Sequence, residues 1–154
     1  MRNTHAPFTD RSAVATYAAD TPRKVPGLAD LHRMTALLLS EQAPGAAHLL
    51  IVGAGGGLEL ASLATAKPGW RFTGVDPSPA MLDLARVAVA PFAERVHLVE
   101  GTVDQAPAGP FDGAKLAVHH AHGLQVALVV FLEHADHLRD GAVDAVEHGD
   151  PIDQ

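Results

Sequence analysis

The sequence contains no cysteine, which excludes disulfide bonds, thiolate metal sites and cysteine nucleophiles. It also lacks any apolar run of the ~18 residues that a membrane-spanning helix needs. Residues 1–10 lack the basic-then-apolar layout of an export signal. We therefore expect no membrane partner and a cytoplasmic location.

Positive charge is the scarcer sign, with 11 Lys and Arg against 18 Asp and Glu, and the net charge of -7 argues against a nucleic-acid partner. The imbalance lies almost entirely at one end. Residues 1–115 hold ten basic and eleven acidic residues, whereas residues 116–154 hold one and seven, together with six of the ten histidines. The 154 residues, 47% hydrophobic and 19% charged, otherwise suit one globular domain.

Short apolar runs alternate with helical periodicity along the first 118 residues. The runs predict strands over 48–52, 71–75, 95–99 and 111–118, and the periodicity predicts helices over 28–43, over 58–66 and from Pro79 onward, capped by Ser78. The first helix places Leu28, Leu31, Thr35, Leu38 and Gln42 near one stripe. This alternation predicts an α/β fold: an open, mostly parallel, Rossmann-like sheet with helices on both faces, and a ligand site beyond the carboxyl ends of the strands.

Candidate ligand positions follow the first two strands. Gly53, Gly55 and Gly57 form a turn whose backbone can approach a ligand closely, because glycine has no side chain. Asp76 ends the second strand, and its two carboxylate oxygens suit a ribose diol. The dinucleotide fingerprint G-x-G-x-x-G/A requires Gly or Ala where this sequence has Leu58, which disfavours a nicotinamide or flavin cofactor.

Four segments resemble, in order and spacing, the motifs of class I methyltransferases that depend on S-adenosylmethionine (SAM). They are LLIVGAGGGLEL, GVDPSPAMLDLAR, RVHLVEGTVDQAP and PFDGA, and the resemblance covers residues 40–115. Residues 17–39 resemble the N-terminal helical cap of the family members that act on small molecules. The resemblance implies a SAM-dependent transferase with a small-molecule acceptor.

The resemblance also implies a role for each cofactor-binding residue. Gly53, Ala54 and Gly55, in the turn that Gly57 completes, would pass beside the methionine portion of SAM. Asp76 would hold the ribose hydroxyls, Pro77 or Met81 would lie against the adenine, and Thr102 and Val103 would border its edge. The sequence departs from the family pattern at Ile51 and Thr102, where many members carry an acid, and this should weaken binding rather than abolish it.

Methyl transfer requires mainly alignment, because the sulfonium is already activated. We therefore name no catalytic residue. Two alternatives stay open: a non-catalytic SAM-binding remnant, and an NAD-dependent oxidoreductase, which Leu58 disfavours.

The family pattern fades after Ala114. We divide the chain into an N-terminal cap (1–46), a SAM-binding core (47–118) and a divergent segment rich in His and acids (119–154), and hypothesise a truncated or frameshifted gene product. That segment predicts a helix over 125–139 and a strand over 142–147. If no further strands follow, apolar surface and an unpaired edge remain exposed beside the fourth strand, and we therefore predict self-association.

The histidines of residues 119–154 match no metal-ligand signature, so no metal site is expected. His48 and His97 are expected to face solvent.

Overall fold

A computed structural model of the chain describes residue 14, residues 16–119 and residues 125–130. Its helices are α2 (Tyr17–Lys24), α3 (Leu28–Gln42), α4 (Leu58–Ala66) and α5 (Pro79–Ala88), with 3-10 turns η2 (Ala90–Phe92) and η3 (Val103–Gln105). Its strands are β1 (His48–Val52), β2 (Arg71–Asp76), β3 (Val96–Glu100), β4 (Gly113–His119) and β5 (Gln125–Val130). The expected strands and helices up to residue 119 are therefore present, with ends shifted by at most two residues.

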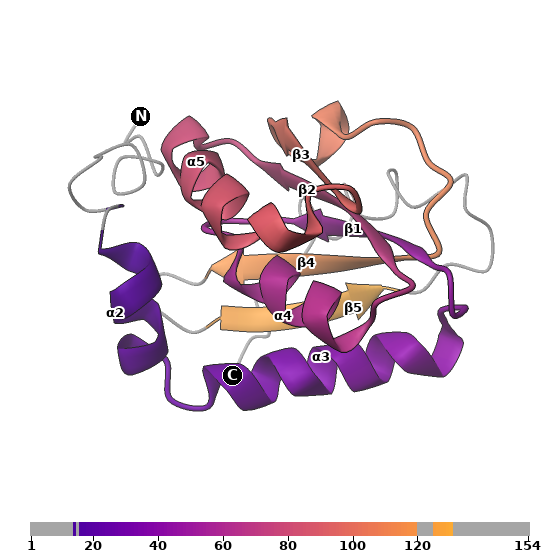
Figure 1. The fold of residues 1–154 in the computed structure, drawn as a ribbon, viewed down its shortest axis with the longest axis horizontal. Coiled ribbons are helices and arrows are strands. Elements are labelled where there is room, and N and C mark those ends of the chain that lie inside the picture. The colour runs from indigo at the N-terminus through magenta and orange to yellow at the C-terminus, as the bar shows by residue number, and fades with distance from the viewer. Residues whose placement is uncertain (1–13, 15, 120–124, 131–154) are drawn as a thin grey trace, which may run out of the picture.

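The five strands form one sheet in the order β3-β2-β1-β4-β5 (Figure 1). The first four are parallel, and β5 pairs antiparallel with β4, with Val130 opposite Ala114 and Gln125 opposite His119. The predicted α/β class with a mostly parallel, Rossmann-like sheet is confirmed. The strand order reverses between β1 and β4, and open sheets of this kind bind ligands outside the carboxyl ends of the strands at such a point.

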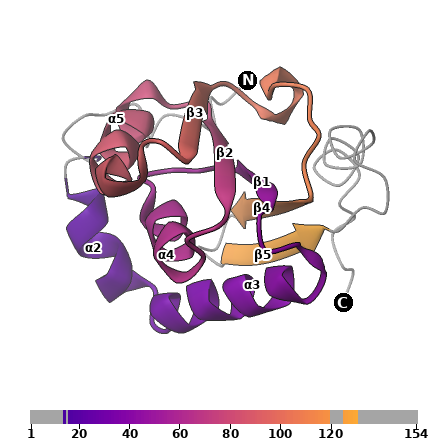
Figure 2. The same ribbon diagram turned by 45° about the vertical axis from the view of Figure 1, so that its right-hand side comes forward.

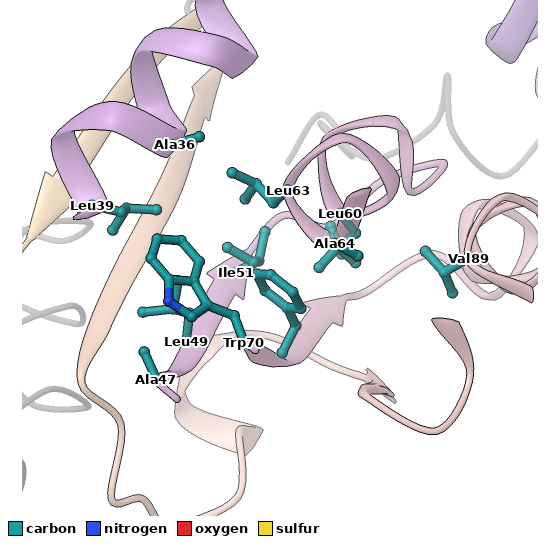
Figure 3. Packing of buried hydrophobic residues seen from close by; sticks show 12 residues of the cluster. Ala36, Leu39, Ala47, Leu49, Ile51, Leu60, Leu63, Ala64, Trp70 and Val89 are labelled. Atoms are coloured by element: carbon teal, nitrogen blue, oxygen red, sulfur yellow. The ribbon is translucent and has the colours of Figure 1, made fainter. Parts of the chain in front are cut away.

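One face of the sheet is covered by α3, α4 and α5. Figure 3 shows Ile51 of β1 next to Leu63 of α4, and the Trp70 indole between Leu49 of β1 and Leu39 of α3. The Trp70 indole nitrogen donates to the Pro44 carbonyl at 2.9 Å, so this polar atom is satisfied inside the core. Full burial of each such aliphatic side chain contributes about 1.5–3 kcal/mol.

Arg95 fastens the end of α4 to the start of β3. Its guanidinium donates to the carbonyls of Ala64, Lys67 and Trp70, at 2.9, 3.2 and 2.6 Å. These include carbonyls at the helix C-terminus that have no partner within the helix, and a cation there is also favoured by the helix dipole.

The opposite face carries a smaller core. Leu50 and Val75 of the central strands pack there with Val103, Phe111 and Leu116. In the described part of the chain, this face is covered by η3 and the connection that leads to β4.

One expectation was wrong in part and another entirely. Of the stripe expected on α3, Leu28 and Thr35 are buried, together with His32, Ala36 and Leu39, whereas Leu38 is 46% exposed. The buried face of α3 differs from the expected stripe because α3 packs along both α4 and β5 (Figures 1 and 2). Residues 125–130 form strand β5 rather than the start of a helix, so the edge of β4 is paired.

The expected strand over 142–147 lies outside the described residues. No helix among those described combines the length and apolar character that a membrane span requires.

Candidate cofactor site

Backbone hydrogen bonds join the loops that follow β1, β2 and β3. The amides of Gly53 and Ala54 both donate to the Val75 carbonyl at 2.9 Å. The Gly101 amide donates to the Asp76 carbonyl at 3.0 Å. Three chain segments far apart in sequence therefore meet at the carboxyl edge of the sheet, as expected for parallel strands.

The glycine turn has a backbone that ordinary residues rarely adopt. The φ angles of Gly53, Gly55 and Gly57 are 73°, 54° and 78°, in the left-handed region that favours glycine. Gly53 and Gly55 are partly exposed at the carboxyl edge, whereas Gly57 is buried. A Cβ at Gly57 would lie 2.8 Å from the Ala85 Cα, so this glycine lets α4 approach α5. Of the three, Gly53 and Gly55 are the ones open to a ligand.

Asp76 ties the turn to the start of α5. Its Oδ2 accepts from the Gly55 amide at 2.8 Å, and its Oδ1 accepts from the Ser78 amide at 2.9 Å. Asp76 is 9% exposed. A carboxylate offers about four lone-pair sites, so two protein donors leave acceptor capacity for hydroxyl groups of a ligand.

The start of α5 forms the next wall of the site. Ser78 is the N-cap, and its hydroxyl accepts from the Met81 amide at 3.2 Å, as expected. Pro77 is exposed and Met81 is 3% exposed. A Cβ at Gly55 would lie 3.5 Å from the Met81 methyl carbon, so Met81 packs beneath the turn.

The residues after β3 divide between surface and core. Thr102 is exposed and forms a capping box with Gln105 at the start of η3. Val103 is 6% exposed and packs into the smaller core on the face opposite the helices. The Val103 side chain thus belongs to the core, and only its backbone remains for a ligand.

Tyr17, which sequence reasoning did not single out, lies against the glycine turn. A Cβ at Gly56 would be 2.8 Å from Cδ1 and Cε1 of Tyr17, and one at Gly55 would be 3.5 Å from its hydroxyl oxygen. Burial raises the pKa of the Tyr17 hydroxyl, the Thr21 side chain opposes this shift, and the charges of Asp76 and Glu59 add to it. The sequence signal was that Tyr17 is the single tyrosine and begins the segment, residues 17–39, that resembles the helical cap of the family.

A buried ion pair lies between α4 and β4. Lys115 on β4 pairs with Oε2 of Glu59, in the first turn of α4, and the two side chains are 9% and 11% exposed. The other carboxylate oxygen, Oε1, is buried without a hydrogen-bond partner. His32 of α3 is also buried, and burial, followed by the Lys115 charge, lowers its pKa, whereas Glu59 opposes this shift.

A separate cavity of about 420 Å³ lies at the amino ends of β1, β2 and β3, away from the glycine turn. Its lining includes His48, whose ring nitrogen lies 2.9 Å from the Thr73 hydroxyl, and exposed His97. His97 faces solvent as expected, but His48 is half-buried.

Among the described residues, no three His, Cys, Asp or Glu side chains are grouped as metal ligands would be. The histidines after His119 lie outside that part of the chain.

The profile of a family described as "Methyltransferase domain" matches residues 50–145. The match therefore continues beyond residue 115, where the resemblance was expected to end. A search of curated proteins finds no match.

Solved structures of methyltransferases are similar to the chain. A SAM-bound amino pentose methyltransferase from Micromonospora echinaspora is 31% identical, with a TM-score of 0.55 over 67% of this chain and 42% of its own. A proposed SAM-dependent methyltransferase from Methanococcus maripaludis is 20% identical, with a TM-score of 0.57 over 71% and 50%. Human N-acetylserotonin methyltransferase in complex with SAM is 20% identical, with a TM-score of 0.54 over 75% and 32%. The chain spans half or less of the length of each.

Proposed function

Because the chain belongs to the methyltransferase domain family, we propose that it binds SAM across the carboxyl ends of β1, β2 and β3 and transfers its methyl group to a small-molecule acceptor. The contact between the Gly55 amide and Oδ2 of Asp76, at 2.8 Å, carries the proposal. It brings a turn with ligand-accessible backbone and a carboxylate with spare lone pairs into one small region.

The residues at this edge fit the chemistry of SAM. Partly exposed Gly53 and Gly55 leave room for the methionine portion to approach the backbone. Asp76 faces the ribose hydroxyls with acceptor capacity remaining after its two protein donors. Exposed Pro77 and buried Met81 form the apolar surface for the adenine, and Thr102 with the Val103 backbone borders it.

Bound SAM supplies a methyl group that its sulfonium already activates. The contribution of the protein is then to hold cofactor and acceptor in line and to limit access of water. Rigid loops suit that task, and here the Val75 and Asp76 carbonyls hold the loops after β1 and β3.

The small-molecule acceptor is supported by the 31% identical neighbour, whose acceptor is an amino pentose. It is also supported by α2, which lies at the end of the sheet toward which β4 points (Figures 1 and 2). We expect a helix at this position to limit the size of the acceptor.

Calorimetry of the full chain with SAM, S-adenosylhomocysteine and NAD tests the cofactor. We expect both sulfur compounds to bind and NAD not to bind. Gly55→Val should abolish binding, because a branched side chain would enter the turn at φ +54°. Gly45→Val is the matched control, since a Cβ there meets nothing within 4 Å. Binding of NAD with indifference to SAM would establish the oxidoreductase alternative.

Turnover tests the transferase step separately. Incubation with SAM and panels of small-molecule acceptors should yield S-adenosylhomocysteine for at least one acceptor class. Tight SAM binding without any turnover would identify the chain as a non-catalytic SAM-binding protein.

A further inference from the structure

The ring of Tyr17 is the part of α2 that reaches the glycine turn. Cδ1 and Cε1 lie 2.8 Å from a Cβ built at Gly56, and the hydroxyl oxygen lies 3.5 Å from one built at Gly55. One edge of the ring therefore packs on the backbone of the turn. The side chain is only half-buried, so another part of it remains accessible.

The backbone that carries this ring is fixed by hydrogen bonds of its helix. The Thr21 hydroxyl donates to the Tyr17 carbonyl at 2.7 Å, one turn along α2. The amides of Ala19 and Asp20 donate to the Thr16 carbonyl at 3.1 and 2.9 Å, so the first turn of α2 is closed. With its backbone fixed and one edge packed on the turn, the ring loses little further conformational entropy when a ligand contacts its accessible part.

The electrostatic surroundings of the ring favour a cation. Burial and the carboxylates of Asp76 and Glu59 all raise the pKa of the hydroxyl, so the ring carries no charge at neutral pH. The Asp76 carboxylate also makes this region unfavourable for an anionic ligand group, whereas the charge of Glu59 is matched by Lys115. An aromatic face attracts a cation that lies within about 6 Å of the ring centre.

We propose that the ring of Tyr17 recognises the sulfonium cation of SAM and so makes the site prefer SAM to its neutral product, S-adenosylhomocysteine. This inference rests on the proposed function, because it concerns the same site. It assigns a specificity role: the ring stabilises the charged cofactor and not the uncharged product, which favours exchange of product for fresh SAM.

The test measures dissociation constants of both compounds for the full chain and two variants. Tyr17→Leu removes the ring, and its affinity for SAM should fall about three- to thirtyfold, with a much smaller change for S-adenosylhomocysteine. Tyr17→Phe retains a ring without the hydroxyl and should preserve the preference of the wild-type chain within about twofold. Met81→Leu is the matched control, because Met81 packs against the same turn but has no ring; it should change both affinities equally.

Two outcomes would overturn the proposal. Equal losses for both compounds in Tyr17→Leu would mean that the ring only supports the turn. Losses as large in Tyr17→Phe as in Tyr17→Leu would assign the effect to the hydroxyl. Both differ from failure of the proposed function, in which the wild-type chain binds neither compound. Melting temperatures of the variants establish that each is folded.

Discussion

Lys115 on β4 and Glu59 on α4 form an ion pair enclosed between the sheet and its helices. Lys115 also lies beside Ile51 in the register of β1 and β4. The chain thus has a buried carboxylate, that of Glu59 on α4, paired with the strand neighbour of Ile51, the position where the family pattern often has an acid. A buried pair of this kind is costly to desolvate, and removal of one partner leaves an uncompensated charge in the interior.

Lys115→Met should therefore lower the free energy of unfolding by about 3–5 kcal/mol, measured by chemical denaturation. The control is Arg33→Met, which breaks the exposed pair with Asp30 and should cost at most about 1 kcal/mol. Adding Glu59→Leu to Lys115→Met should recover most of the loss, because no buried charge remains. A double variant as unstable as the single one would mean that the loss comes from packing.

Gly57→Ala should destabilise the chain by about 2–4 kcal/mol, the sum of a strained backbone and an overpacked contact with Ala85. Gly27→Ala separates the two effects, because Gly27 has the same φ of +78° and a Cβ there meets nothing within 4 Å. We expect only the backbone strain there, about 1–2 kcal/mol. If chemical denaturation finds equal losses of unfolding free energy in Gly57→Ala and Gly27→Ala, the contact between α4 and α5 is not tight.

Asp76→Ala should weaken SAM binding by about 1–3 kcal/mol, the range for losing a charge-assisted hydrogen bond. It should also lower the melting temperature, since the Gly55 and Ser78 amides lose their acceptor. Asp83→Ala removes the same charge from the exposed side of α5 and serves as the control. If calorimetry finds unchanged affinity while the melting temperature falls, Asp76 only holds the turn.

His32 should make the chain less stable in acid. Its pKa is lowered, chiefly by burial, so below the unfolded pKa of about 6.5 the unfolded chain binds more protons than the folded one. Stability from neutral His32 is thus present above that pH and lost as the pH falls. The drop in unfolding free energy between about pH 7.5 and pH 5.5 should be smaller in His32→Gln. An unchanged drop would assign the acid sensitivity elsewhere.

Local sequence signals predicted the framework of the site because they act over a few residues. Ser78 and Pro79 predicted the start of α5. The apolar run of residues 48–52, followed by Gly57, predicted the turn between β1 and α4. The position of Asp76 at a strand end then followed from the parallel sheet.

Features that depend on tertiary packing could not be predicted in this way. A short apolar run such as residues 125–130 fits a strand or a helix equally, and pairing with β4 decides between them. The same limit applies to α3, whose buried side follows from α4 and β5 lying together beneath it. Tyr17 meets Gly56 only when the chain folds, and no spacing rule relates them.

The antiparallel direction of β5 sets a distance for the rest of the chain. Gln125 starts beside His119 at the carboxyl edge, and Val130 ends beside Ala114 near the opposite edge. At about 3.3 Å per residue, β5 carries the chain roughly 15–20 Å away from the glycine turn. Under the proposed function, sequence after Val130 would have to cover that length again to reach the glycine turn, whereas Tyr17 of α2 already lies against it. The length of sequence after Val130 therefore decides whether the C-terminal end of the chain can contact the proposed cofactor site at all.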